Sequence, residues 1–165
     1  CHDASDRDMR LLAPICGLVL LDQWSKHWIQ RHLLYGERIE VWPGVFDIRY
    51  VRNTGAAWGM LAGWRPLLIL FAACMLALIV RRRRDIFSGW RGGQASLALL
   101  VAGIAGNLID RVRLGYVVDF LDFYRQAWHF PAFNVADSAI CVGIGLYLLG
   151  QMRPVARPAA DDPAR

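Results

Sequence analysis

Four apolar segments alternate with polar stretches along the chain. They cover residues 11–29, 64–80, 95–112 and 134–150. Each is close to the length of about 17–25 predominantly apolar residues that crosses a bilayer as a helix. The pattern therefore predicts an all-α membrane protein with four transmembrane helices. Little sequence remains for a separate soluble domain, so we expect residues 1–165 to form one domain.

The polar stretch at 30–63 is too long to be a simple connection. Its sequence ERIEVWPGVFDIRYV alternates β-branched or aromatic residues with polar ones around Pro43-Gly44, which predicts short strands and a turn. At its end, Asn53 offers hydrogen-bond donors and acceptors, and the small residues at 55–57 permit close backbone approach. Taken alone, these last residues fit an ordinary turn into the next helix.

The stretch between the third and fourth segments predicts two short elements. The sequence VVDF after Gly115 favours a piece of extended backbone. The following LDFYRQAWHF is amphipathic and rich in aromatic residues, which is typical of a helix lying in the membrane interface. The tail at 151–165 is polar and rich in proline, so we expect it to be disordered.

Composition supports a membrane protein. Hydrophobic residues make up 56% of the chain and its mean hydropathy is +0.29. The net charge of +5 does not indicate nucleic-acid binding, because the basic run Arg81–Arg84 directly follows an apolar segment and fits a membrane-flanking anchor. The four cysteines have neither paired nor metal-ligand spacing, so no disulfide, metal site or cofactor is expected. The first segment contains Asp22 and Lys26 without a small-residue cleavage site, so we do not expect a cleavable signal peptide.

The distribution of arginine predicts the orientation in the membrane. Arginines lie near both ends of the chain and in the linker after the second segment, and cytoplasmic loops carry the excess of basic residues. With four crossings these three regions share one side, so both termini, including the tail, are expected in the cytoplasm. The unusual polar residues then collect near the outer surface: Asp22, Lys26, Asn53, Asn107, Asp110, Arg111, Asn134 and Asp137.

Asp119 and Asp137 are the candidate catalytic pair. An ionisable residue at membrane depth is costly and marks a functional site by default. Two carboxylates held close together share a proton, because one pKa rises. The ionised member can take a proton from water while the protonated member polarises a peptide carbonyl, which is general acid–base hydrolysis without a covalent intermediate.

Some of these residues also have purely structural interpretations. Asn134 can cap the fourth helix with Asp137 in its first turn, which is compatible with catalysis but does not require it. Asp122 is expected to be a solvated interfacial residue.

Two charged pairs leave the same choice open. Asp22 and Lys26 lie four residues apart, so they share one helix face and either neutralise each other or brace the site from a neighbouring helix. Asp110 and Arg111 fit a salt bridge or a helix-end anchor as well as a functional role.

Five short motifs, taken in order, resemble the lipoprotein signal peptidases (signal peptidase II) of bacteria. They are Asp22-Gln23-Trp24-Ser25-Lys26, Asn53-Thr54-Gly55-Ala56-Ala57, Gly106-Asn107-Leu108-Ile109-Asp110-Arg111, Gly115-Tyr116-Val117-Val118-Asp119-Phe120 and Phe133-Asn134-Val135-Ala136-Asp137-Ser138. Each motif alone is weak, whereas all five in this order among four apolar segments are highly specific.

The resemblance implies an aspartic endopeptidase of the bacterial inner membrane with four transmembrane helices, a small extracytoplasmic β-sheet at 30–52, a mobile periplasmic helix at 121–129 and an outward-facing site. Its substrates would be prolipoproteins whose cysteine carries diacylglycerol, cut just before that cysteine, and globomycin would inhibit it. Asp119 and Asp137 would be catalytic. The supporting and substrate-binding positions would be Asp22, Lys26, Asn53, Gly106, Asn107, Asp110, Arg111 and Asn134.

Two other classes of membrane protein have intramembrane carboxylates. A proton-coupled carrier would use them as a relay, but it would need polar residues through the bilayer centre, and the middles of the second and fourth segments are apolar. A structural or assembly protein would use the polar cluster only for helix packing. Substitution of the aspartates would then reduce stability and affect no turnover.

Overall fold

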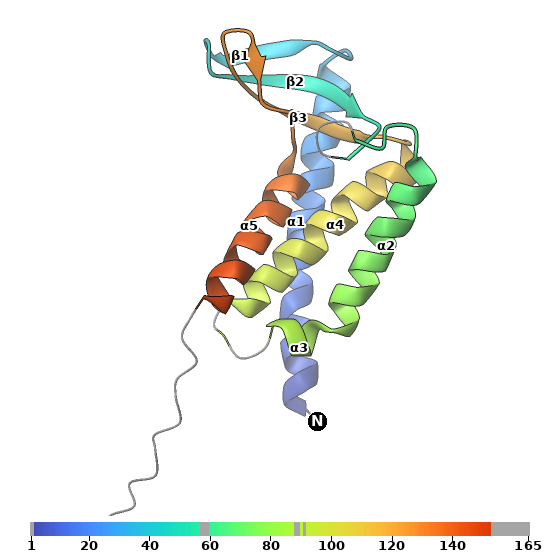
Figure 1. Cartoon of the computed structure of the whole chain (residues 1–165), viewed down its shortest axis with the longest axis vertical. Helices are drawn as coiled ribbons and strands as arrows, with labels where there is room; N and C mark the ends of the chain where they lie inside the picture. Colours follow the sequence, from blue (N-terminus) through green and yellow to red (C-terminus); the bar gives the residue numbers. More distant parts are fainter. Residues whose placement is uncertain (1, 57–59, 88–89, 91, 153–165) are drawn as a thin grey trace, which may run out of the picture.

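A computed structural model describes residues 2–56, 60–87, 90 and 92–152, with side chains from residue 11 onward. Within these ranges the helices run side by side and an antiparallel sheet covers one end of them (Figure 1). The elements are α1 (His2–His32), β1 (Arg38–Trp42), β2 (Phe46–Asn53), α2 (Arg65–Arg81), α3 (Arg83–Phe87), α4 (Gly93–Arg113), β3 (Val117–Arg125), β4 (Trp128–His129) and α5 (Val135–Gln151).

Three of the predicted helices agree closely with α2, α4 and α5. The first is longer than predicted, because α1 begins at His2 and includes the polar residues before the apolar segment. Those residues contain no glycine or proline, so nothing in them stops a helix, although their polarity would keep them out of an apolar core. The predicted tail lies almost entirely outside the described residues, as does Ala57 of the second motif.

Only one helix within the described ranges, α4, combines the length and apolar composition that a bilayer crossing requires. The similarly apolar α5 has 17 residues, which rise about 25 Å against a hydrocarbon core of about 30 Å. The α2 helix also has 17 residues, and α1 has charged residues in its second half. Helix length and composition alone therefore do not establish four crossings.

The sheet has the strand order β1-β2-β3-β4, and all its neighbours are antiparallel. The predicted hairpin is confirmed, with Gly44 at a φ of 78° in the turn between β1 and β2. The strand β3 follows α4 in the chain and adds to the other side of β2, where Asp119 lies opposite Val51. The sheet thus brings residues from before α2 next to residues from after α4.

The predicted interfacial helix at 121–129 is wrong. These residues form the second half of β3, a turn and β4. The residues VVDFLDFYR are rich in β-branched and aromatic side chains, and β2 offers a free edge with which they can pair. A short amphipathic stretch can match both the 3.6-residue repeat of a helix and the two-residue repeat of a strand. The edge of β2 therefore decides that these residues form a strand.

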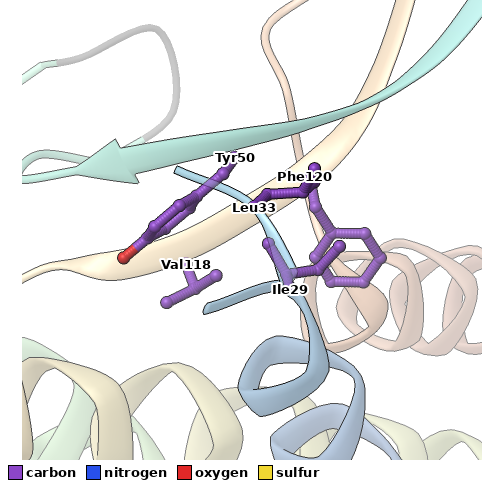
Figure 2. Close-up of a cluster of buried hydrophobic side chains, with 5 residues drawn as sticks. All are labelled: Ile29, Leu33, Tyr50, Val118 and Phe120. Atoms are coloured by element: carbon purple, nitrogen blue, oxygen red, sulfur yellow. The ribbon is translucent and has the colours of Figure 1, made fainter. Parts of the chain in front are cut away.

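A small hydrophobic cluster joins the sheet to the end of α1. It consists of Ile29 and Leu33 near the end of α1, Tyr50 on β2, and Val118 and Phe120 on β3, all less than 8% exposed (Figure 2). Burial of a large apolar side chain stabilises a fold by about 1.5–3 kcal/mol, so the cluster holds the sheet firmly against the helices.

Small residues let α4 lie close against α5. A methyl group added at Gly103 would lie 2.5 Å from the Ala136 carbonyl oxygen, and one at Gly143 would lie 2.9 Å from Leu100 Cγ. The hydroxyl of Ser96 also donates to the Gly143 carbonyl at 2.7 Å. Gly103 therefore marks a close contact between α4 and α5, and α4, which also contacts α1 and α2, is the central helix.

Candidate active site

Asp119 and Asp137 reach the same cleft from different elements. Asp119 lies on β3, three residues into the strand, and Asp137 lies in the first turn of α5. Asn134 is the N-cap of α5: its side-chain oxygen accepts from the Asp137 amide at 2.9 Å, and its own amide donates to Asp137 Oδ2 at 3.2 Å. The N-cap that the sequence offered at Asn134 is thus present, and the structure completes it as a capping box that fixes one of the two carboxylates.

Three asparagines donate hydrogen bonds to the two carboxylates. Asn134 Nδ2 donates to Asp119 Oδ1 at 2.7 Å, so the same residue that caps α5 also holds the other aspartate. Asn53 Nδ2 donates to Asp119 Oδ2 at 3.0 Å. Asn107 Nδ2 donates to Asp137 Oδ1 at 2.7 Å. Each carboxylate is therefore held in place through both of its oxygens.

A buried group of three charges lies beneath the asparagines. Lys26 Nζ lies 2.9 Å from Asp22 Oδ2 and 3.0 Å from Asp110 Oδ2, and none of the three residues is more than 2% exposed. The ammonium also donates to Asn107 Oδ1 at 3.0 Å. Since an ammonium can only donate, it turns the oxygen of Asn107 toward itself and the NH₂ group toward Asp137.

Asp22 and Asp110 also hold the backbone next to each candidate. The Ala136 amide donates to Asp22 Oδ1 at 2.9 Å, and the Val118 amide donates to Asp110 Oδ2 at 3.1 Å. Residues 136 and 118 immediately precede Asp137 and Asp119. Asp22 and Lys26 thus form the predicted intrahelical pair and also brace the site.

Arg111 holds the loop that contains Asn53. Its Nη2 donates to the Gly55 carbonyl at 2.9 Å, and the Gly55 amide donates to Asn53 Oδ1 at 2.9 Å. Among the described contacts Asp110 forms its ion pair with Lys26, so the salt bridge left open for Asp110 and Arg111 is not the interaction that the structure describes for Asp110. Gly106 is required for space, because a methyl group there would lie 2.6 Å from Asp22 Oδ2.

The structure brings together all ten residues that the sequence singled out. It adds Gln23, which the sequence analysis quoted only as part of a motif. Gln23 Nε2 donates to Asp110 Oδ1 at 3.0 Å and to the Gly106 carbonyl at 3.2 Å. A polar residue beside Asp22 in an apolar segment was the available signal.

Asp122 corrects another prediction. It is 2% exposed rather than solvated, and its carboxylate lies 3.0 Å from His129 Nδ1. The ring of His129 reaches Asp122 because β4 folds back along β3.

The cleft beside Asp119 and Asp137 has a volume of about 610 Å³. Asn53, Asn107 and the two aspartates line its polar end. Arg111 and Ser138 also line it, and most of the remaining lining is apolar, including Val117, Phe133, Ile140 and Val142. Such a shape suits a largely apolar ligand with one polar group at the carboxylates.

Burial and the nearby charge of Asp137 raise the pKa of Asp119 from 3.8 to about 7, against the opposing effect of the Asn53 and Asn134 hydrogen bonds. A carboxyl group with this pKa carries its proton in about half of the molecules at pH 7, whereas an ordinary aspartate is almost fully ionised there. The arrangement can therefore perform general acid–base chemistry on a carbonyl bound in the cleft.

Comparisons with known proteins show the family to which the chain belongs. The sequence profile of signal peptidase II matches residues 15–153. The chain is 44% identical to the lipoprotein signal peptidase of Geobacter sulfurreducens, over 89% of this chain and 94% of that protein. It is 45% identical to that of Neisseria gonorrhoeae, over 79% and 82%.

Two solved structures are also similar. Both are bacterial membrane enzymes determined by the in meso method, at 2.3 and 1.9 Å resolution. They have TM-scores of 0.76 and 0.75 and sequence identities of 33% and 31%, and they cover 86% and 88% of this chain and 87% and 94% of theirs. The chain belongs to the signal peptidase II family and is a membrane protease that processes lipoproteins.

Proposed function

We propose that this protease removes the signal peptide from prolipoproteins whose cysteine carries diacylglycerol, cutting just before that cysteine. The observation that carries the proposal is the pair of carboxylates, each fixed through two oxygens, at the polar end of an apolar cleft. The apolar walls are suited to acyl chains and to the hydrophobic part of a signal peptide. The carboxylates at the rim meet the one polar bond that must be cut.

In the proposed mechanism Asp119 and Asp137 share one proton. The ionised carboxylate takes a proton from a water molecule, which attacks the scissile carbonyl, while the protonated carboxyl donates to the carbonyl oxygen. The tetrahedral intermediate then collapses, and the amine of the cysteine leaves with a proton from the dyad. The products are a signal peptide with a new carboxylate and a lipoprotein whose cysteine has a free amino group.

The exterior of the helices supports four membrane crossings. Large apolar side chains on α2 and α5 are exposed: Leu67, Leu70, Phe71, Leu78, Val80, Val142, Ile144, Leu148 and Leu149. Such a surface is stable in contact with lipid and unfavourable in water. We therefore place the helices across the bacterial inner membrane, with both termini and α3 in the cytoplasm and the sheet and site on the outer side. A lipidated substrate reaches this site laterally.

Globomycin, the inhibitor implied by the family resemblance, is expected to occupy the same cleft. Its binding would therefore compete with the lipidated precursor and raise the apparent KM.

The first experiment measures cleavage of a diacylglyceryl-modified precursor peptide by the purified protein in detergent. We expect cleavage of this peptide and none of the same peptide without lipid. Asp119→Asn and Asp137→Asn should each reduce the rate by about 100-fold or more while the thermal unfolding profile is retained. Asp85→Asn is the matched control, because Asp85 is exposed on α3 at the opposite end of the helices.

Two outcomes would contradict the proposal. One is the absence of cleavage by a folded, monodisperse wild-type protein. The other is a loss of stability without loss of turnover in the two dyad variants, which is the behaviour of a polar cluster that serves only helix packing.

A further inference from the structure

A second cleft meets the first one at Asp119. It has a volume of about 460 Å³ and shares Asn53, Asp119 and residues 130–132 with the apolar cleft. Its remaining walls come mainly from β2, β3 and β4, and they include Arg49, Arg52 and His129. The two clefts therefore continue from the same carboxylate in different surroundings, one among helices and the other along the sheet.

The charged groups of the second cleft are arranged in two levels. Asp122 is buried at the bottom, 3.0 Å from His129 and 3.7 Å from Arg49. The side chains of Arg49 and His129 are 43% and 39% exposed. A molecule entering this cleft thus meets hydrogen-bond donors, while the acidic group beneath them is already engaged.

Arg52 is held rigidly at this cleft. Its guanidinium carbon lies 5.1 Å, 5.3 Å and 5.1 Å from the ring centroids of Tyr35, Tyr50 and Tyr116. Its Nε also donates to the Tyr50 hydroxyl at 3.1 Å. A cation stacked among three rings loses little further freedom when it meets an anion, so the positive charge is preorganised.

We propose that this arginine-lined cleft binds the residues that follow the lipidated cysteine and selects for acidic over basic side chains there. This inference rests on the proposed function, in which the apolar cleft takes the lipid and the signal peptide. The product chain must then leave along the other cleft. Asp122 lies three residues beyond Asp119, a rise of about 10 Å along the strand, which an extended peptide covers within the first two residues after the cysteine.

The test compares three diacylglyceryl-modified precursors that differ only in the two residues after the cysteine, which are Asp-Asp, Asn-Asn or Lys-Lys. We expect the wild-type protein to cleave the Asp-Asp precursor with a kcat/KM about tenfold higher than that of the Lys-Lys precursor, with Asn-Asn between them. Added salt should reduce this ratio, because the groups are partly exposed.

Three variants locate the effect. In Arg49→Gln the ratio of kcat/KM for the Asp-Asp precursor to that for the Lys-Lys precursor should fall to about threefold or less. In Arg49→Lys this ratio should be close to that of the wild type, since the charge is kept. Arg125→Gln is the matched control, because Arg125 is exposed on the same sheet and does not line the cleft. Its ratio should equal that of the wild type. Thermal unfolding of each variant shows whether the fold is retained.

The outcomes separate the two proposals. Equal kcat/KM values for the three precursors in the wild type overturn the acidic preference while leaving the peptidase function intact. An equal fall of the ratio in Arg49→Gln and Arg125→Gln overturns the assignment to this cleft. Failure of a folded wild-type protein to cleave any lipidated precursor overturns the proposed function itself.

Discussion

Asp22 and Asp110 hold the backbone on which the two carboxylates of the proposed dyad are mounted. Each accepts a hydrogen bond from the backbone amide of the residue just before a member of the dyad, and both form ion pairs with the ammonium of Lys26. The backbone next to Asp119 and the backbone next to Asp137 are thus connected through one compact group of charges.

We predict a large loss of stability in Lys26→Met. The substitution leaves Asp22 and Asp110 buried without a counter-charge, and removal of one partner of a buried ion pair costs about 3–5 kcal/mol. The midpoint of denaturant unfolding in micelles measures the change. Arg31→Met is the control, because Arg31 is exposed near the end of the same helix. Similar losses of stability in both variants would show that the buried ion pairs of Lys26 are not the cause of the loss.

We predict that activity falls as pH rises through about 7. The pKa of Asp119 is raised to about 7, so above this pH the dyad loses the proton with which it polarises the carbonyl. The dyad titrates as a unit, so the profile reports the pair. The measurement is kcat for a lipidated precursor between pH 5 and 9. A rate that is constant or rises from pH 6 to 9 would contradict the prediction.

The same raised pKa predicts a pH dependence of stability. Between the ordinary value of 3.8 and about 7, the folded protein keeps a proton on Asp119 that the unfolded chain releases. The stability contributed by the protonated carboxyl is therefore complete below about pH 4 and is lost as pH rises through about 7. Asp119→Asn, which stays neutral, should show a smaller decrease of unfolding free energy over this range.

At the scale of elements, the sequence predicted the positions of α2, α4 and α5 and the β1–β2 hairpin because each has a strong local signal. The strand β3 was harder to predict. Its partner, β2, lies more than sixty residues away in the chain, and only that pairing decides that 121–125 are strand. The burial of Asp122 was missed for the same reason, since it depends on β4 and His129 folding over it.

The candidate site was more predictable than the sheet. Most of its residues lie near the ends of apolar segments, where polarity is conspicuous, and topology brings those ends together, whereas Asn53 and Asp119 lie on strands. The sequence could not specify which amide donates to which carboxylate. Nor could it predict that Asn134, which caps α5 by accepting from the Asp137 amide, also donates to Asp119. That second contact depends on the position of β3 relative to α5.

We predict that the close contact of α4 and α5 fails in Gly103→Ala. The added methyl group would lie 2.5 Å from the Ala136 carbonyl oxygen and 2.6 Å from Ile140 Cγ1, so the helices must separate near Asp137. Both thermal stability and cleavage rate should fall. Gly145→Ala on α5 is the control, because nothing lies within 4 Å of the added group. It should be neutral or stabilising by up to about 1 kcal/mol. Equal effects of the two changes would contradict the prediction.

At the scale of the whole molecule, the sheet and α3 lie at opposite ends of the helices (Figure 1). The proposed orientation puts the sheet outside and α3 in the cytoplasm. We predict that a membrane-impermeant maleimide labels Arg125→Cys in cells whose outer membrane is permeabilised and whose inner membrane is intact. It should label Asp85→Cys only after the inner membrane is opened. Both are made in a variant whose native cysteines are replaced by alanine.

The labelling result is decisive in either direction. Labelling of both positions before the inner membrane is opened would place α3 and the sheet on the same side of the membrane, which contradicts the proposed orientation. The reverse pattern, with Asp85→Cys labelled first, would place the proposed site in the cytoplasm, where a precursor exported across the membrane could not reach it.

The charge at position 26 has one more consequence. Lys26 is the only lysine among the 165 residues, and its ammonium is enclosed by Asp22, Asp110 and Asn107. A protease that cuts after lysine therefore has a single bond to attack in this sequence, and that bond lies inside α1. It becomes accessible only when α1 separates from α4. The rate of this one cut under native conditions therefore reports how readily the helix bundle opens.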